Sequence, residues 1–296
     1  MSRITEMLGC RYPVILGAMG VICNPELVAA VSDAGGFGLL ATAFTPDVKT
    51  FRNQIQLTKK LTDRPFGANL QVMNPMTQKL AEVLAKENVR VVTVSGGSPK
   101  AIVPFLKDLS IKVILVVPNV DVAKKAEDLG VEAIVAEGSE SGGIQGFRGA
   151  STMVLIPAVV DAVKVPVIAA GGIGDSRGYK AALALGAEGV QVGTRFIATK
   201  ECIAHQNYKK IIIDAPETGT GLLNMGHFQI RALRTQRVEK ILAGEAMGQK
   251  IVFGGPGLEE SWVKGDIEAG ELPAGEVSGL IHNILCAKDI INEMVG

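Results

Sequence analysis

Aromatic residues are scarce in this chain, at 4% of 296 residues, although hydrophobic residues make up 47%. The core must therefore be built from Val, Ile, Leu and Ala rather than from rings. That composition is typical of parallel β-strands that are buried on both faces. The length exceeds that of a small domain, but α/β barrels of this size commonly form one unit.

The chain also has few cysteines, and no two of its four form a CxxC motif. Cys10, Cys23, Cys202 and Cys286 lie far apart in the sequence. A zinc or iron–sulfur site built from cysteine alone is therefore not expected, and we predict no metal site. Such isolated cysteines are typical of reduced thiols in a cytosolic protein, so we expect a cytoplasmic location.

Long apolar runs and blocks of one charge are missing as well. No stretch of about 18 apolar residues is present, and the first residues do not resemble a signal peptide, so no membrane span is expected. The 30 Lys and Arg residues balance the 30 Asp and Glu residues, and no basic block stands out. We therefore expect no nucleic-acid partner.

Eight short apolar runs repeat along the chain, many of them meeting Gly, Asn or Ser, and a segment with helical periodicity then follows. Their spacing is mostly about 20 to 30 residues, which is typical of β-α units with right-handed crossovers. The runs are continuous rather than alternating, as buried parallel strands are. They cover residues 13–16, 37–40, 66–70, 89–94, 112–116, 133–136, 167–170 and 189–192.

This repeat predicts an α/β fold, a (β/α)8 TIM barrel. A doubly wound open sheet is the alternative, but the count of eight and the glycines at the carboxyl ends of the strands favour the barrel. Residues 199–262 break the repeat and read as amphipathic helices at 203–214 and 223–242. We interpret them as a helical lid over the barrel mouth, within a single domain of residues 1–296. A last helix over residues 278–294 is expected to close the barrel.

Glycines follow the seventh and eighth predicted strands, where this fold commonly binds phosphate. The loops read AAGGIGDSRG, with Gly171 and Gly172, and QVGTRF, with Gly193 and Thr194. Glycine lets backbone N–H groups approach a phosphate closely, and a helix N-terminus adds a favourable field. The alternative is that these glycines only form tight β-α turns.

Other residues at strand ends suit a planar ring. The apolar turn Gly17-Ala18-Met19 could pack on its face, although Met also fills gaps in cores. Asn69 could bond the edge of a heterocycle or simply cap a turn. Glu137 could act as a base, contact a polar ring or form an ion pair, and Ser141 and Gln145 follow it in a Gly-rich loop. The predicted cofactor-binding residues are Gly17, Ala18, Met19, Asn69, Gln71, Glu137, Gly142, Gly143, Gly171, Gly172, Gln191, Gly193 and Thr194.

At these residues the sequence resembles the nitronate monooxygenase family, formerly called 2-nitropropane dioxygenases, and the related enoyl-ACP reductase II enzymes. The segments that carry the resemblance, in order, are YPVILGAMGVICNPELVAAVSDAGGFGLLA, FGANL, AEGSESGGIQG, VPVIAAGGIGD and GAEGVQVGTRFIAT. The C-terminal PAGEVSGLI also resembles that family, which usually has Gln where this chain has Glu276.

The resemblance implies FMN bound in a TIM barrel. It places Ala18 and Met19 at the isoalloxazine, Asn69 at the ring or ribityl edge, and Glu137 near the flavin. It places Gly171–Gly172 and Gly193–Thr194 at the phosphate. A small-molecule or acyl-thioester substrate and a homodimer are the expected partners, with NAD(P)H as a further candidate cofactor.

One departure bears on the chemistry. The family's loop typically reads Glu-Gly-x-Glu-Ala-Gly-Gly-His, with the His beside the flavin, and this chain has Ile144 at that position. Isoleucine can neither accept a proton nor donate a hydrogen bond. The catalytic residues are therefore unknown from the sequence, with Glu137, Ser141 and His227 as candidates. His227 could reach the mouth from the lid or be a structural residue.

Four functions remain open. The leading hypothesis is oxidation of an alkyl nitronate with O2, because an ionised nitronate needs no base to remove a carbon proton. The second is NAD(P)H-dependent reduction of an enoyl thioester or a quinone. The third is a flavin-free phosphosugar lyase or isomerase that uses the same phosphate pocket. The fourth is a flavin-binding paralogue without catalytic activity.

Overall fold

Eight parallel strands close into a barrel in the computed structural model, which describes residues 2–146, 149–226, 228–245 and 257–296. The hydrogen-bonded order is β1-β9-β8-β6-β5-β4-β3-β2, and a parallel bridge between Ile15 and Phe37 joins the first strand to the second. This confirms the predicted TIM barrel. The strands are β1 (Val14–Leu16), β2 (Gly38–Ala41), β3 (Phe66–Gln71), β4 (Val91–Ser95), β5 (Lys112–Val117), β6 (Ala133–Glu137), β8 (Val167–Ala170) and β9 (Gly189–Val192).

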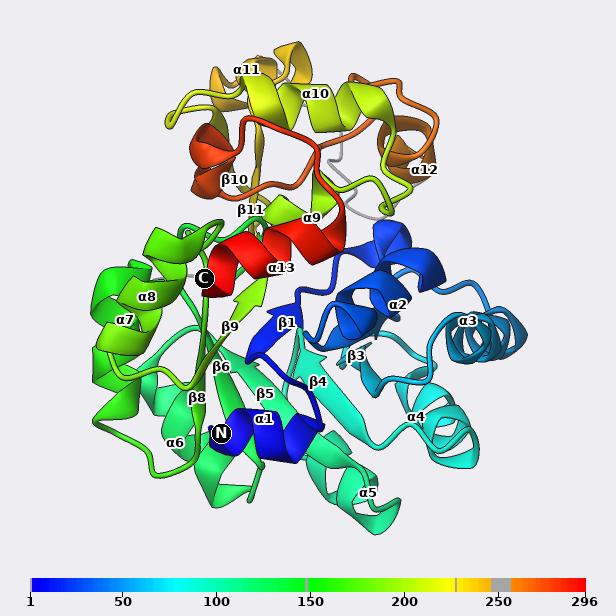
Figure 1. Cartoon of the computed structure of the whole chain (residues 1–296). Helices are drawn as coiled ribbons and strands as arrows, with labels where there is room; N and C mark the ends of the chain where they lie inside the picture. Colours follow the sequence, from blue (N-terminus) through cyan, green and yellow to red (C-terminus); the bar gives the residue numbers. More distant parts are fainter. Residues whose placement is uncertain (1, 147–148, 227, 246–256) are drawn as a thin grey trace.

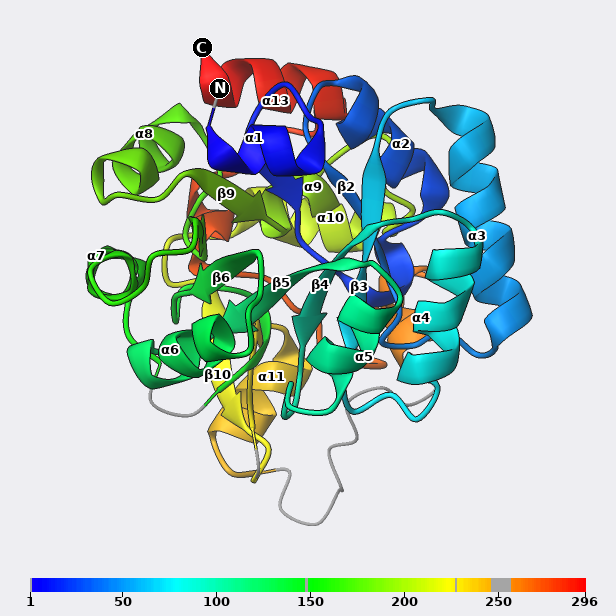
Figure 2. The same cartoon turned by 90° about the horizontal axis from the view of Figure 1, so that it is seen from below.

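Helices cover the outside of the barrel (Figures 1 and 2). They are α2 (Pro25–Asp33), α3 (Val48–Leu61), α4 (Thr77–Lys86), α5 (Ile102–Asp108), α6 (Val120–Asp128), α7 (Thr152–Val160), α8 (Ser176–Ala184) and α13 (Ala287–Val295). The cap of α8 is Asp175, whose carboxylate accepts from the N–H groups of Arg177 and Gly178. Ser176 is the first residue inside the helix.

The amino-terminal end of the barrel is closed by helix α1 (Arg3–Leu8). Its Ile4 and Leu8 are buried against the apolar interior, together with Ile15, Phe37 and Ile114. In Figure 2 this helix lies across the near end of the barrel. Because that end is filled by side chains, we expect a ligand site at the opposite end, where strands of this fold carry their functional residues.

A second layer lies above that opposite end (Figure 1). It contains α9 (Thr194–Ile197), α10 (Gln206–Asp214), α11 (Gln236–Leu242), α12 (Gly257–Trp262) and the 3-10 helix η2 (Glu276–Leu280). It also contains β10 (Thr220–Asn224) and β11 (Gln229–Leu233), an antiparallel pair. The pair is extended by β7 (Gly143–Gln145), which comes from the loop after β6. A further 3-10 turn, η1 (Gly20–Ile22), follows β1.

Two of the expected helices differ from the structure. The helix predicted over 223–242 is wrong in its first part, because Thr220–Asn224 and Gln229–Leu233 form the strands β10 and β11. Leu223, Ile230 and Ala232 are buried on one side of this hairpin, so their spacing is that of strands rather than of a helix turn.

The helix predicted over 278–294 begins only at Ala287. A Cβ on Gly279 would lie 2.5 Å from Cα of Glu217, so the backbone there is held against residue 217 by a close contact. The 3-10 helix η2 ends at Leu280, and an irregular stretch precedes α13.

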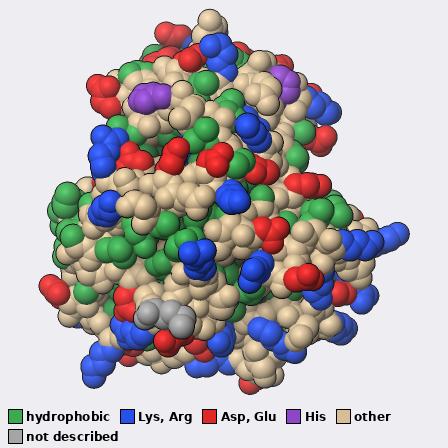
Figure 3. All heavy atoms as spheres, in the orientation of Figure 1, with side chains coloured by type: hydrophobic (Ala, Val, Ile, Leu, Met, Phe, Trp, Pro, Cys, Tyr) green, Lys and Arg blue, Asp and Glu red, His purple; other side chains and the backbone are tan. Residues whose placement is uncertain are grey.

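Charged side chains of both signs are intermixed on the face drawn in Figure 3, in agreement with the even charge balance. Among the described residues, no helix is both long and apolar enough to cross a bilayer.

Candidate active site

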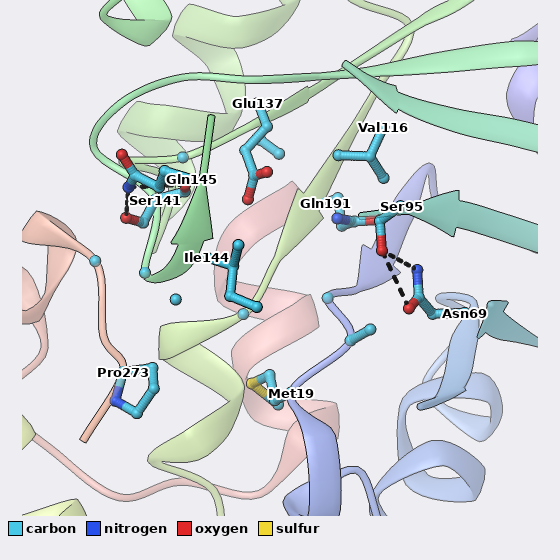
Figure 4. Close-up of a pocket in the computed structure, with 18 of the residues that line it drawn as sticks. Met19, Asn69, Ser95, Val116, Glu137, Ser141, Ile144, Gln145, Gln191 and Pro273 are labelled. Atoms are coloured by element: carbon cyan, nitrogen blue, oxygen red, sulfur yellow. Dashed lines mark hydrogen bonds between the residues drawn. The ribbon is translucent and has the colours of Figure 1, made fainter. Parts of the chain in front are cut away.

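A cavity of about 580 Å³ opens at the carboxyl ends of the barrel strands (Figure 4). Its volume lies in the range of pockets that hold cofactors and small substrates. All thirteen predicted cofactor-binding residues line this cavity. Further lining residues come from the second layer, including Tyr208, Phe228, Trp262 and Pro273. The structure thus brings the predicted residues together, while their contact with a cofactor stays a prediction.

One corner of the cavity is formed by the loops after β8 and β9. Gly171 and Gly172 have φ angles of 98° and 73°, in the left-handed region that favours glycine. A Cβ on Gly172 would meet only the Glu140 side chain, at 3.5 Å, and one on Gly193 only the Met19 thioether, at 3.8 Å. Within the described part of the chain, the N–H groups of Gly172 and Gly193 donate to no acceptor. The corner therefore offers free amide donors beside open space.

A third segment completes this corner from the second layer. Gly275 N–H donates to Oγ1 of Thr194 over 2.9 Å, and Glu276 N–H donates to the carbonyl oxygen of Glu140 over 3.0 Å. A Cβ on Gly142 would lie 2.5 Å from the carbonyl carbon of Ala274. Gly142 is therefore required for the close packing of two backbones, which is a different role from presenting a free amide.

The floor of the cavity is the turn after β1. Gly17 N–H donates to the carbonyl oxygen of Val192 over 2.7 Å, which ties this turn to β9. The Cys23 thiol is buried below the turn, with its sulfur 3.1 Å from the amide nitrogen of Met19. Burial raises the pKa of Cys23 to about 12, so its thiol stays neutral. This agrees with the view of Cys23 as an inert core thiol.

Polar side chains gather on the wall formed by β3, β4 and β9. The Asn69 amide donates to the hydroxyls of Thr93 and Ser95 over 3.0 and 3.1 Å, so much of its capacity is used within the protein (Figure 4). Gln191 differs, because its Oε1 is buried and has no hydrogen-bond partner among the described residues. A buried amide oxygen without a partner is costly. Gln191 is thus suited to accept a hydrogen bond from a ligand.

Two carboxylates of the loop after β6 have opposite surroundings. Glu140 accepts from the N–H and hydroxyl of Thr152 over 2.7 and 2.6 Å, at the start of α7. Glu137 points into the cavity (Figure 4), and burial raises its pKa to about 7. The Ser141 hydroxyl opposes that rise, because it favours the ionised carboxylate.

The Gln145 side chain forms hydrogen bonds within this loop. Its amide donates to the carbonyl oxygens of Ser139 and Ser141 and lies 3.2 Å from the Ser141 hydroxyl. Gln145 also lines the cavity, and its contact with a ligand stays a prediction. Its contact with the Ser141 hydroxyl orients the group that lowers the pKa of Glu137.

Ile144, at the position where the family resemblance places a histidine, sits in β7. Its side chain is half-buried at the edge of the cavity and packs against an apolar cluster that includes Leu223 and Ile230. The site therefore presents a methyl-covered wall where a base was expected. His227, which the sequence offered as a candidate catalytic residue, lies outside the described residues.

Sequence reasoning missed the aromatic part of the cavity. Phe44 and Trp262 form an edge-to-face pair with ring centroids 6.2 Å apart, and Tyr208 lies 6.4 Å from Trp262. Together with Phe228 they line the cavity, although the chain has few aromatic residues in all. In a chain with so few aromatic residues, each one is a candidate for a special role, and four of them converge on this site.

No group of three or more His, Cys, Asp or Glu side chains in the described ranges is arranged to hold a metal ion.

The comparisons with known proteins agree on one family. The sequence model of the nitronate monooxygenase family matches residues 1–82 and 73–296. The structure of FabK from Thermotoga maritima superposes with a TM-score of 0.92 at 37% identity and covers 100% of this chain and 95% of that one. A nitroalkane oxidase from Streptomyces ansochromogenes gives 0.86 at 26% identity, over 99% and 96%.

Two curated relatives extend this picture. One from Rhodococcus jostii, named (3aS,4S,5R,7aS)-5-hydroxy-7a-methyl-1-oxo-octahydro-1H-indene-4-carboxyl-CoA dehydrogenase, is 31% identical over 99% of this chain and 94% of its own length. The "Probable nitronate monooxygenase" of Staphylococcus aureus is 33% identical over 74% of both chains. FabK is an enoyl-ACP reductase II, so these relatives are oxidoreductases, and the family implies a flavin. The chain belongs to the nitronate monooxygenase family and is an oxidoreductase of the type which that family shares with the enoyl-ACP reductases.

Proposed function

We propose that this cavity binds FMN and that the protein uses the flavin to oxidise alkyl nitronates with O2. The observation that carries the cofactor assignment is the glycine corner, whose free N–H groups at Gly172 and Gly193 face open space. Such convergent amides suit a phosphate dianion. The described lining contains no Lys or Arg that could bind the phosphate elsewhere in the cavity.

The remaining donor set fits the rest of the cofactor. Gln191 supplies an unpaired acceptor for an N–H or O–H group, and Asn69 and Gln71 supply amides nearby. The turn Gly17-Ala18-Met19 gives an apolar surface for a ring face. FMN would supply the two-electron chemistry, while the protein binds, orients and excludes water.

The residues of this chain favour a substrate that arrives ionised. Ile144 cannot remove a carbon proton, and a nitronate has already lost that proton. The aromatic residues Phe44 and Trp262 and the isoleucine wall provide an apolar surface for the alkyl group. We assign residues 199–262 the role of a lid within a single domain of residues 1–296, since Tyr208 and Trp262 of this segment line the cavity.

A second candidate is redox chemistry on an acyl thioester, with NAD(P)H as the electron donor for a reductase. The similarity to FabK and to the CoA-ester dehydrogenase favours it, because both extend over nearly the whole chain. The described cavity lining contains no Lys or Arg that would select an anionic substrate.

Anaerobic mixing of the purified protein with its candidate partners tests the proposal. The flavin absorbance, near roughly 450 nm, is followed after addition of a nitronate, NADH or NADPH. Bleaching by the nitronate alone supports nitronate oxidation, and rapid bleaching by a nicotinamide supports the reductase. A flavoprotein that none of these reduces would be a non-catalytic paralogue. A colourless protein that refuses excess FMN would overturn the assignment and favour the flavin-free lyase or isomerase.

We further propose a cytoplasmic homodimer. All four cysteines are free, as is typical of proteins in a reducing compartment. Light scattering of the purified protein would test the dimer.

A further inference from the structure

Glu137 is a carboxylate that faces the cavity without a compensating charge. The titratable groups of the described lining are Glu137, Glu140 and Tyr208. Glu140 is held by Thr152, and the Tyr208 hydroxyl donates to the carbonyl oxygen of Pro273 over 2.5 Å. Glu137 has the Ser141 hydroxyl alone.

The strands packed around Glu137 add no charge. The cavity residues nearest along the wall are Val116 of β5, Ala170 of β8 and Gln191 of β9, and Ile144 of β7 faces them across the loop (Figure 4). All are uncharged. In a histidine-containing relative the position of Ile144 would hold a group able to carry a positive charge, so this chain lacks a natural counter-ion for the carboxylate.

A ligand in the cavity makes this charge less favourable still. Filling the cavity removes water from the carboxylate, and a buried anion without a partner is destabilised relative to its neutral acid. A second negative charge placed nearby would add direct repulsion, which is weakly screened in a dry site. Filling the cavity alone raises the pKa of Glu137, and only the added negative charge makes its neutral form the stable one.

We propose that Glu137 takes up a proton from solvent when the bound flavin is reduced and releases it when the flavin is reoxidised. This inference rests on the proposed binding of FMN. On reduction, two electrons and one proton enter the flavin and leave one negative charge on its ring system, and one further proton converts the Glu137 carboxylate to the acid. Reoxidation returns the two electrons and the flavin proton to the acceptor and the Glu137 proton to solvent.

The geometry also assigns the supporting residues. Ser141 bonds the ionised carboxylate and so sets how readily the proton is released, and Gln145 orients that hydroxyl. These two are positioning residues. Glu137 itself is the group that exchanges the proton, and because the described lining has no Lys, Arg or His, no basic side chain there can take this role.

The midpoint potential of the bound flavin, measured against pH, tests the proposal. Between about pH 7 and pH 9 the wild-type potential is expected to fall with the slope of two protons per two electrons. In Glu137→Gln the slope is expected to halve, to one proton per two electrons. The matched control is Glu140→Gln, which removes the other carboxylate of the same loop and is expected to keep the wild-type slope. Equal slopes in wild type and Glu137→Gln would overturn the proposal.

A direct spectroscopic measurement keeps the test independent of turnover. Reduced-minus-oxidised infrared difference spectra are expected to show the C=O stretch of a carboxylic acid appearing on reduction, and Glu137→Gln is expected to lack that band. Ser141→Ala is expected to retain the band and to shift its pH dependence upward, because the ionised form loses its hydrogen bond. Failure to bind FMN would count against the proposed function, whereas bound flavin with no such band would count against Glu137 alone.

Discussion

Ile144 lies directly opposite Ile230 in the antiparallel pairing of β7 with β11. The two side chains belong to one apolar cluster with Leu223 and Val238, which fixes Ile144 at the edge of the cavity. The loop after β6 is thereby joined to the second layer by a strand and by apolar contact. The position where the family resemblance expects a proton-accepting residue is instead part of the packing that holds the second layer in place.

Restoring the histidine should change which substrate form is used. Ile144→His is expected to raise activity on a neutral nitroalkane relative to its nitronate, because imidazole can remove the carbon proton. It should cost about 1–2 kcal/mol in stability, since a polar ring replaces an apolar contact. Steady-state rates on the nitroalkane and on its nitronate give the ratio of the two activities. Ile144→Leu is the control for the change in packing. An unchanged ratio in the histidine variant would show that this residue does not control proton removal.

The glycine corner predicts a strong effect of charge at Gly172. Gly172→Asp should weaken FMN binding by about tenfold or more, because it places an anion beside the phosphate. Gly172→Ala introduces the positive-φ strain without the charge and should lose less affinity. Titration of the apoprotein with FMN, followed by quenching of flavin fluorescence, measures both. If the aspartate variant binds as tightly as the alanine variant, the phosphate lies elsewhere.

The buried carboxyl of Glu137 also predicts how the stability of the cofactor-free protein depends on pH. Its pKa is raised to about 7 from the ordinary value of 4.5 for a glutamate, so the folded protein binds this proton more tightly than the unfolded chain does. The resulting stabilisation is fully present below about pH 4.5 and is lost as pH rises to about 7. Relative to Glu137→Gln, the wild type should lose up to about 3 kcal/mol across this window. Urea unfolding of both proteins between these pH values checks it, and parallel curves would contradict it.

The barrel and much of the site could be predicted from the sequence because each rests on local patterns. Most of the eight strands are continuous apolar runs, and Gly or Ser stands at or just after the carboxyl end of β1, β4, β6, β8 and β9. Once the barrel is assumed, all strand ends meet at one mouth, so Gly17, Asn69 and Gly172 converge without further information. The orphaned amide oxygen of Gln191 needed the structure, since only packing shows which polar atoms lack a partner.

The second layer could not be predicted in the same way. In residues 223–242, the apolar positions Leu223, Ile230 and Val238 fit helical spacing as well as strand spacing. In the structure β11 pairs with the nearby β10 and also with Gly143–Gln145, which is about 80 residues away in the chain and too short to stand out. Long-range pairing of this kind leaves no local signal. The same holds for Trp262, whose indole donates to the carbonyl oxygen of Glu271 and faces Phe44 from another layer.

The four thiols should differ widely in reactivity, which tests the turn under the cavity floor. Burial raises the pKa of Cys23 to about 12, and of Cys10 and Cys202 to about 11. The thiolate is the reactive form, so at pH 8 only about one Cys23 in ten thousand is reactive. Cys286 is half-buried near the surface, with its sulfur 2.9 Å from Oδ2 of Asp289, and should be alkylated first. Iodoacetamide labelling read by mass spectrometry gives the order, with urea-unfolded protein as the control in which all four react. Early labelling of Cys23 in the native protein would mean that the Gly17–Met19 turn opens readily, and the floor assigned to the flavin ring would lose its support.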